Sequence, residues 1–248
     1  MPRYRLTVEY DGTRFCGWQR QENGFSVQQA LEEAIGQFAR HAVAVFAAGR
    51  TDAGVHACGQ VVHVDLQAAW DAAKVAESAN GTLKHAGHAI AVLDAALVLN
   101  DFDARFSALR RTYRYRIINR WANLTLDHNR AWHVKRPLDA PAMHRAAQFL
   151  VGHHDFTTFR SQHCQAKSPM KTLENLAVEQ VDAQEMLVTA VSRSFLHNQV
   201  RSMVGSLKLV GEGKWQPSDM RMALEARNRK ACGPVAPACG LYLLHVEY

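Results

Sequence analysis

The segment A-G-R-T-D-A-G-V-H-A, residues 48–57, places a basic and an acidic residue on either side of one threonine. A plain connection between two strands needs only glycine and something polar, and Gly49 and Gly54 supply the glycine. An isolated aspartate in such a loop is usually a turn residue that hydrogen-bonds to its own backbone. Arg50 favours a different interpretation, because a nearby guanidinium lowers the pKa of a carboxyl group and fixes its direction. An ionised and oriented Asp52 could act as a nucleophile or as a general base.

The segment R-F-S-A-L-R-R-T-Y-R-Y-R, residues 105–116, carries five arginines. In a strand, Tyr113 and Tyr115 would lie on one face and Arg114 and Arg116 on the other. Two interpretations stay open from this segment alone. It is either an amphipathic edge strand with solvated arginines, or a tyrosine platform for a nucleic-acid base flanked by phosphate contacts. The second interpretation makes three arginines candidates for substrate binding: Arg110, Arg111 and Arg114.

Arg201 lies in S-R-S-F-L-H-N-Q-V-R-S-M-V-G-S-L, residues 192–207, among apolar residues at helical spacing. An arginine in such a position needs a carboxylate partner, because burial of an unpaired charge is costly. Asp52 is an obvious candidate for that partner. The apolar positions are Phe195, Val200, Met203, Val204 and Leu207.

The 13 histidines and five cysteines raise the possibility of a metal site. His56 and His63 could serve as ligands in principle, but the H-E-x-x-H, H-x-E with P-C-x-x-C and paired C-x-x-C patterns are all absent. Scattered histidines at the surface or in the core explain the count better. The scattered, odd-numbered cysteines indicate reduced thiols in a cytosolic protein. We therefore expect no metal and a cytoplasmic location.

The charge balance fits a polyanionic partner. The 248 residues carry a formal net charge of +6, and the calculated pI is about 9.2. A modest excess of this kind is weak evidence by itself. No apolar run approaches the roughly 18 residues of a membrane span, and the N-terminal residues become polar too soon for a signal peptide. We expect no membrane association.

The elements predicted in residues 1–104 follow the order β-α-β-β-α-β of the split βαβ, or ferredoxin-like, unit. Ser26 is a good N-cap, and Gln29 three residues later completes a capping-box pattern. The 48–57 segment falls in the loop between the second and third strands. The predicted strands are Arg3–Tyr10, Ala42–Ala47, Gln60–Leu66 and Ala89–Leu99, and the predicted helices run from Val27 to Phe38 and from Ala68 to about Leu83.

A similar pattern recurs in residues 105–248. The expected strands are Arg111–Asn119, Ala131–Lys135, Thr172–Val181, Met186–Arg193 and Leu241–Glu247, and the expected helices are Asp139 to about Leu150, Leu196 to Val210 and Ser218–Asn228. The chain is thus predicted to be α+β, with two related halves and mostly antiparallel sheet. Helices on one side of such a sheet leave its other face free for a ligand.

Six blocks, in this order along nearly the whole chain, resemble the tRNA pseudouridine synthase A family. They are Y-D-G-T-R-F-C-G-W-Q-R-Q (10–21), A-G-R-T-D-A-G-V-H-A (48–57), D-F-D-A-R-F-S-A-L-R-R-T-Y-R-Y-R-I (101–117), D-F-T-T-F-R (155–160), F-L-H-N-Q-V-R-S-M-V-G-S-L (195–207) and G-L-Y-L-L-H-V-E-Y (240–248). The resemblance implies two ferredoxin-like halves related by a pseudo-twofold, an RNA-binding cleft, and a homodimer. It implies conversion of uridine to pseudouridine at positions 38–40 of the anticodon stem-loop of tRNA, with no metal or cofactor.

Carried over by position, the resemblance makes Asp52 the catalytic aspartate and places Arg50 at the flipped nucleotide or the backbone left behind. Tyr113 matches a tyrosine that stacks on the target base, Arg201 an arginine that pairs with the catalytic aspartate, and Leu241 a leucine that packs against the base. Asp52 could act by attack at C1′, by addition at C6 or by abstraction of the 2′ proton, and the sequence does not choose among these.

The chain departs from the family at S-A-N-G-T-L-K-H-A-G-H-A-I, residues 78–90, where Lys84 stands in place of an expected proline. The shape of this segment and its RNA contacts are thereby left open. Two other functions compete with the enzyme. A tRNA-binding protein or chaperone without turnover would not require Asp52, Arg50, Tyr113 and Arg201 together, and a metal-dependent deaminase or hydrolase lacks the ligand spacing.

Overall fold

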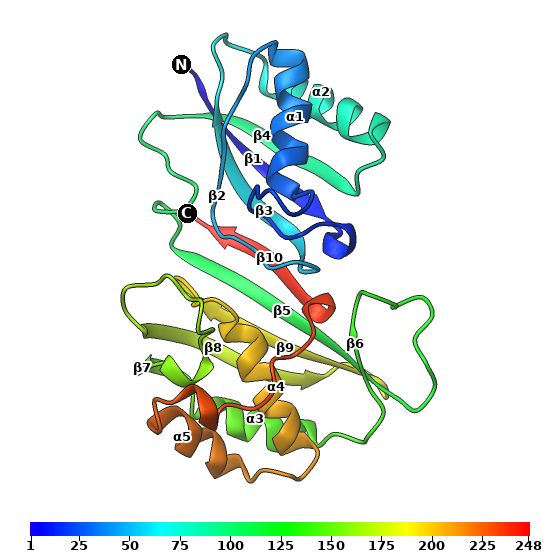
Figure 1. Ribbon diagram of the computed structural model, residues 1–248, viewed down its shortest axis with the longest axis vertical. Helices are drawn as coiled ribbons and strands as arrows, with labels where there is room; N and C mark the ends of the chain where they lie inside the picture. The colour runs from blue at the N-terminus through cyan, green and yellow to red at the C-terminus, as the bar shows by residue number, and fades with distance from the viewer. The chain divides into compact units, whose positions relative to one another are not determined.

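The computed structural model describes residues 1–248 and divides into two compact units. Unit 1 comprises Met1–Leu109 with Tyr242–Tyr248, and unit 2 comprises Arg110–Leu241. The sequence placed the division between residues 104 and 105 and the last strand in the second half. Each unit combines helices with a mostly antiparallel sheet, which confirms the predicted α+β class (Figure 1).

Unit 1 has a sheet in the order β4-β1-β3, with two further strands on the outer edge of β3. The short β2 pairs antiparallel with the later part of β3, and β10 pairs parallel with its first two residues. This pairing explains why the last seven residues of the chain (242–248) belong to unit 1. The elements are β1 (Arg3–Tyr10), α1 (Val27–Ala39), β2 (Val45–Ala47), β3 (His56–Asp65), α2 (Ala72–His85), β4 (Ile90–Val98) and β10 (Leu241–Glu247).

The core of unit 1 lies between this sheet and its two helices (Figure 1). Alternate residues of β1 are buried, and α1 buries an apolar face that comprises Val27, Ala30, Leu31, Ala34 and Ile35. The Ser26 hydroxyl accepts a hydrogen bond from the Gln29 N–H at 3.1 Å, so the predicted N-cap is present. The reciprocal half of a capping box is not, because the Gln29 amide donates to Glu33 instead.

The segment that departs from the family forms the end of α2 and the turn after it. Lys84 lies in the last turn of the helix, and Gly87 has a φ of +69° that favours glycine. Asn80 joins the helix to β4, since its side chain donates to the Val92 carbonyl at 2.8 Å and accepts from the Val92 N–H at 2.7 Å.

Unit 2 has the sheet order β5-β9-β8-β7, and β6 pairs parallel with β5. The arrangement β5-β9-β8 repeats that of β1-β3-β2 in unit 1, with the third strand in the middle. The elements are β5 (Arg110–Asn119), β6 (Trp132–Val134), α3 (Ala140–Gln148), β7 (Gly152–Asp155), β8 (Met170–Gln180), β9 (Glu185–Ser192), α4 (Gln199–Gly211) and α5 (Pro217–Glu225).

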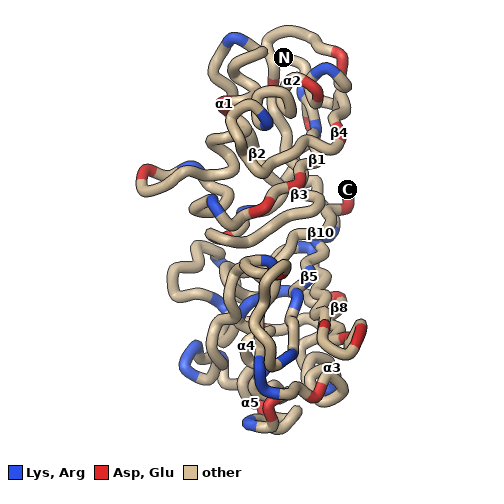
Figure 2. Tube along the Cα trace, turned by 90° about the vertical axis from the view of Figure 1, so that its right-hand side faces the viewer, with Lys and Arg blue, Asp and Glu red and all other residues tan.

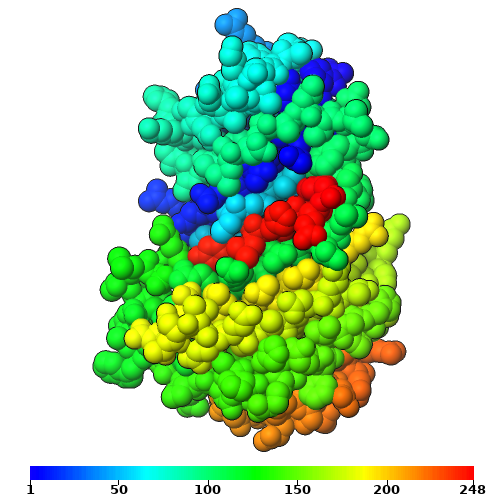
Figure 3. Space-filling view, turned by 180° about the vertical axis from the view of Figure 1, so that it is seen from behind, coloured from blue at the N-terminus to red at the C-terminus, as the bar shows by residue number.

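Helices cover one face of the unit 2 sheet, and the strands β8 and β9 form the surface when it is seen from behind (Figure 3). The buried face of β5 carries Tyr113, Tyr115 and Ile117, and the alternate residues Arg110, Thr112, Arg114 and Arg116 lie on the other side. This alternation of tyrosines and arginines was predicted. None of the helices combines the length and the apolar character that a membrane span requires.

Candidate functional site

The R-T-D segment forms the loop between β2 and β3, and its middle residue anchors it. Thr51 is 7% exposed, whereas Arg50 is exposed and Asp52 is half-buried. The Thr51 hydroxyl lies 2.8 Å from the hydroxyl of Tyr10, inside the core of unit 1. Burial raises the pKa of Tyr10 to about 12, so the phenol stays protonated at neutral pH and the hydrogen bond persists.

Backbone contacts hold the same loop from both sides. The Trp18 N–H donates to the Thr51 carbonyl at 3.0 Å, and the Gln60 amide donates to the Gly49 carbonyl at 2.7 Å. A Cβ at Gly17 would lie 2.8 Å from the Thr51 oxygen, so only glycine allows this close approach. The aspartate is therefore presented on a loop whose backbone is fixed, as an oriented catalytic carboxylate requires.

His56, the first residue after this loop, links the loop to the turn that follows β1, residues 11–13. The His56 ring is 3% exposed and stacks on Tyr242 of β10 at a centroid distance of 4.7 Å. Its Nδ1 accepts a hydrogen bond from the Gly12 N–H at 3.1 Å and lies 3.2 Å from a carboxylate oxygen of Asp11. His56 thus packs and positions the loop, which agrees with the interpretation of the histidines as structural.

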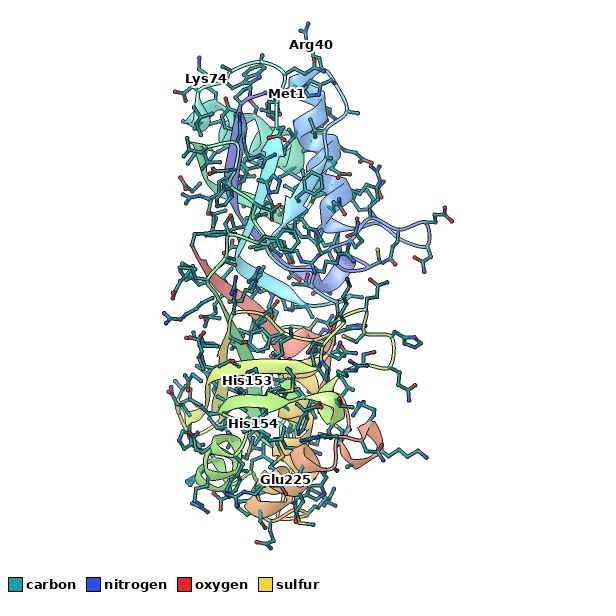
Figure 4. All side chains as sticks on the ribbon, turned by 90° about the vertical axis from the view of Figure 1, so that its left-hand side faces the viewer. Met1, Arg40, Lys74, His153, His154 and Glu225 are labelled. Atoms are coloured by element: carbon teal, nitrogen blue, oxygen red, sulfur yellow. The ribbon has the colours of Figure 1, made fainter.

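Two histidines of unit 2 also make ordinary hydrogen bonds. His153 and His154, consecutive on the edge strand β7 (Figure 4), contact the Thr172 hydroxyl at 2.9 Å and the Val151 carbonyl at 3.0 Å. The five cysteines are free thiols. The structure has no group of three or more His, Cys, Asp or Glu side chains placed to hold a metal ion.

In unit 2, Arg201 of α4 is oriented by two acceptors. Its Nε donates to the Ala236 carbonyl at 2.8 Å, and its Nη1 donates to the Asn198 side-chain oxygen at 3.0 Å. Asn198 precedes α4 with a φ of +62°, a conformation that asparagine tolerates better than most residues. Its side chain makes no N-cap hydrogen bond. We infer that Asn198 serves Arg201 rather than the helix.

The segment 232–240 passes over α4 and leads to Leu241. At Gly205 a Cβ would lie 1.7 Å from the Pro234 oxygen, so the segment packs directly on the helix backbone. It also meets β5, because the Tyr115 hydroxyl donates to the Pro237 carbonyl at 2.7 Å and burial raises the pKa of that tyrosine. This path brings Arg201, Tyr115 and the buried Leu241 into one part of unit 2.

Tyr113 also lies on the helix-covered side of unit 2, not on the open sheet face that was expected to receive a ligand. Its side chain is buried. Its ring contacts the edge of the ring of Phe195, a residue shortly before α4, with 5.2 Å between the ring centroids. The open face instead carries arginines that are largely engaged within the protein. Arg110 pairs with Glu174 at 2.6 Å, and Arg116 pairs with Asp127 and Glu185.

The remaining predicted arginines differ in their surroundings. Arg111 is 7% exposed, and its guanidinium donates to the Arg193 carbonyl. Arg114 is half-buried, and its Nε has no hydrogen-bond partner within the chain. Basic residues occur in both units, and several lie along β5 (Figure 2). The predicted site residues are thus divided: Arg50 and Asp52 belong to unit 1, and Arg110, Arg111, Tyr113, Arg114, Arg201 and Leu241 belong to unit 2.

Sequence reasoning missed the residues that hold the site residues in place. Tyr10 and Thr51 are separated by 41 positions, and no local pattern pairs them. For Asn198 the sequence offers only a general tendency, since asparagine adopts positive φ more often than most residues. The sequence does not reveal which asparagines adopt a positive φ.

Comparison with known proteins identifies the relatives of the chain. The family model described as tRNA pseudouridine synthase matches residues 6–107 and 146–248, so β5 with Tyr113 lies outside both segments. Two proteins named tRNA pseudouridine synthase A, from Rhizobium meliloti (strain 1021) and Agrobacterium fabrum (strain C58), are each 59% identical to the chain over its full length. The match covers 100% of the Rhizobium meliloti protein and 93% of the Agrobacterium fabrum protein. The protein of that name from Brucella ovis is 58% identical, over 100% of this chain and 98% of that one. Among solved structures, a chain of a Cbf5-Nop10-Gar1 complex gives a TM-score of 0.35 at 10% identity, covering 83% of this chain and 45% of that one, a likeness too weak to add to these results.

Proposed function

Because the chain belongs to the tRNA pseudouridine synthase family, we propose that it isomerises uridine to pseudouridine in tRNA with Asp52 as the catalytic carboxylate. The chain is an isomerase that acts on tRNA, as its relatives at about 58% identity over the full length indicate. The observation that supports Asp52 is its place on a loop fixed by the buried Tyr10–Thr51 hydrogen bond.

The reaction makes particular demands on a site. The N1–C1′ bond of the uridine breaks, the uracil turns, and a C5–C1′ bond forms, after which C5 loses its proton and N1 gains one. The uridine must first leave the base stack, which costs a few kcal/mol. Since the broken and the formed bonds lie within one bound fragment, positioning supplies much of the catalysis. A fixed loop that carries one carboxylate suits this chemistry.

The remaining roles follow the family resemblance. We propose that Arg50, exposed beside Asp52, contacts the RNA backbone or the flipped nucleotide. Tyr113 stacks on the target base, and Leu241 packs against it. Arg201 supplies the positive charge that keeps the catalytic carboxylate ionised, and Asn198 and the Ala236 carbonyl orient its guanidinium for this role.

The substrate site on the tRNA and the assembly also follow the resemblance. We propose that the targets are positions 38–40 of the anticodon stem-loop, that Arg110, Arg111 and Arg114 assist in RNA binding, and that the enzyme is a cytoplasmic homodimer. The net charge of +6 supports a polyanionic partner. The proposed reaction needs neither a metal nor a cofactor.

The test is the pseudouridine content of an unmodified tRNA transcript after incubation with the protein in EDTA. Wild type is expected to form pseudouridine in the anticodon arm. Asp52→Asn, which keeps the size of the side chain, is expected to bind the tRNA but to lose at least about a hundredfold in rate. Asp101→Asn, at an exposed position of the same unit, is the matched control and should keep the wild-type rate.

The competing function gives a different result. A tRNA-binding protein without turnover would bind the transcript with wild-type residues and leave every uridine intact. An Asp52→Asn variant with the wild-type rate would instead remove Asp52 from the chemistry and leave the enzyme class unchanged.

A further inference from the structure

The loop that joins β5 to β6, residues 120–131, presents a tryptophan to solvent. Trp121 is 84% exposed, although tryptophan is largely buried in most proteins. The loop stands out from unit 2 beside β6 (Figure 1). Single exposed apolar residues are common on protein surfaces, so the significance of Trp121 depends on how its loop is held.

Arg120 fixes the loop directly around the tryptophan. Its guanidinium donates to the carbonyls of Ala122 at 3.2 Å and Asn123 at 3.0 Å, and to the Gln184 side-chain oxygen at 3.2 Å. The Arg120 carbonyl in turn accepts a hydrogen bond from the His133 ring at 2.9 Å. The backbone on either side of Trp121 is therefore restrained while the indole itself stays in solvent.

The far end of the loop is tied to β5. The Asp127 carboxylate pairs with the Arg116 guanidinium at 3.0 Å, and the Arg116 Nη1 also donates to the Arg130 carbonyl at 3.4 Å. The Arg130 N–H donates to the Asp127 carbonyl at 2.9 Å, which closes a turn. A loop ordered before binding loses less conformational entropy when a ligand binds, so this arrangement favours recognition.

The charge of the segment that contains Trp121 favours a polyanionic ligand. Residues 120–136, called here the tryptophan surface, include one acidic residue, Asp127, which is paired with Arg116. Two further acidic residues line a hollow beside Arg120 and are also engaged. The Asp182 carboxylate accepts the N–H groups of Gln184 and Glu185, and the Glu185 carboxylate pairs with Arg116 at 2.7 Å. The basic residues of the surface are Arg120, Arg130, Lys135 and Arg136.

We propose that the tryptophan surface is a further contact for the tRNA, in which Trp121 stacks on an unpaired base and the basic residues contact phosphates. Proteins recognise unpaired RNA bases by stacking them on aromatic rings beside a positively charged path for the backbone. The surface lies outside both segments that the family model matches. The inference rests on the proposed function in taking tRNA as the substrate.

The test first compares the affinities of wild type and three single variants for two RNAs, a full-length tRNA transcript and an anticodon-arm hairpin, by fluorescence anisotropy. Trp121→Ala is expected to weaken binding of the full-length tRNA by about five- to a hundredfold. Trp121→Phe, which keeps an aromatic face, should recover most of this loss. Leu126→Ala is the matched control, because Leu126 is 90% exposed on the same loop and has no ring, and it should bind like wild type.

The hairpin locates the contact. Loss with both RNAs supports stacking on a base of the anticodon arm, and loss with the full-length tRNA alone supports stacking elsewhere. The double variant Lys135→Gln/Arg136→Gln should reduce the dependence of binding on salt, with a slope lower by about one for each lost phosphate contact.

Pseudouridine formation and sedimentation velocity on the same samples separate the possible failures. If wild type forms pseudouridine and Trp121→Ala binds tRNA as tightly, the inference is overturned and the proposed function stands. A variant that keeps its tRNA affinity but changes its oligomeric state would assign the surface to a second copy of the chain, which also overturns the inference. Wild type that forms no pseudouridine contradicts the proposed function.

Discussion

The position of Asp52 depends on the residue before it. Thr51 points into the core of unit 1, where its hydroxyl meets that of Tyr10, and Asp52 follows it directly as a half-buried residue. A carboxylate on a loop without such an anchor would sample many directions, and each lost orientation lowers the rate. The hydroxyl pair thus connects the core of the unit to the candidate chemistry.

Replacement of Tyr10 by phenylalanine tests this connection. The loss of a buried hydrogen bond is expected to lower the free energy of unfolding by about 1 kcal/mol. We expect kcat to fall more than KM rises, because Asp52 loses orientation and not contact area. Tyr4→Phe is the matched control on the same strand, since the Tyr4 hydroxyl bonds Trp70 at 2.8 Å away from the R-T-D loop. An equal loss of kcat in both variants would show that general destabilisation is responsible.

Asn198 offers a second test, because its two roles can be separated. Asn198→Gly keeps the positive φ without strain, so stability should change by no more than a few tenths of a kcal/mol. It removes the acceptor for Arg201, and we expect kcat to fall by about tenfold or more. Arg40→Gly, at a φ of +58° at the end of α1 (labelled in Figure 4), is the control and should keep full activity. Thermal unfolding and tRNA turnover measure both effects, and full activity of Asn198→Gly would contradict the role.

For individual residues, the sequence predicts the candidate catalytic residues better than the residues that fix their positions. Asp52 is recognisable because Arg50 and two glycines are its neighbours in sequence. Tyr10 is not, because its contact with Thr51 depends on the register of β1 against the chain after β2. The two acceptors of Arg201, the Ala236 carbonyl and the Asn198 side-chain oxygen, were also unpredictable, since an arginine among apolar residues indicates a need for acceptors but not which ones.

Among the elements, β3 carries a buried histidine that links the sheet to the segment leaving unit 1. His63 is 4% exposed, its ring stacks on Phe46, and its Nδ1 accepts a hydrogen bond from the Ala104 N–H at 3.0 Å. Burial, and then the charge of Arg3, lower the pKa of His63 below its usual value near 6.5. The folded state thus favours the neutral ring.

The stability of unit 1 should therefore depend on pH through His63. A lowered pKa means that the unfolded chain binds the proton more readily, so stability is full above about pH 6.5 and falls as the pH drops from there toward the folded-state pKa. Denaturant unfolding at pH 7.5 and pH 5.5 measures the difference. His63→Asn, which keeps an acceptor but cannot titrate, should reduce it, and His153→Asn on the exposed part of β7 should not. An unchanged difference in His63→Asn would exclude this histidine as the cause.

The elements themselves were predictable where their patterns are local. The bounds of β1 and β10 agree with the alternation in the sequence, and α1 begins after the predicted cap. β3 begins at His56, earlier than predicted, because its first residues pair with β10 from the other end of the chain. β7 was missed, since its four residues, with two histidines, carry no apolar alternation.

On the scale of the whole molecule, the chain closes unit 1 with its own last residues. The Leu109 N–H donates to the Glu247 carbonyl at 2.8 Å, and the Tyr248 hydroxyl donates to the Ala104 carbonyl at 2.7 Å. Two related halves could be predicted from the repeated order of elements. The return of the last strand could not, because strand pairing between distant segments leaves no local pattern.

Removal of residues 242–248 is expected to loosen unit 1 where these residues pair with it. Amide hydrogen exchange should become faster at His56 and Ala57 and in the segment 99–109, because both lose backbone partners. The β7–β8 pairing, at the edge of unit 2, should exchange as in the intact chain and serves as an internal reference. Tyr248→Phe removes one hydrogen bond and should give a smaller effect confined to the residues around Ala104, whereas His245→Ala, exposed on β10, should give none. Unchanged exchange at His56 in the truncated chain would mean that β3 keeps its order without β10, and that the fixed R-T-D loop depends on Tyr10, Trp18 and Gln60 alone.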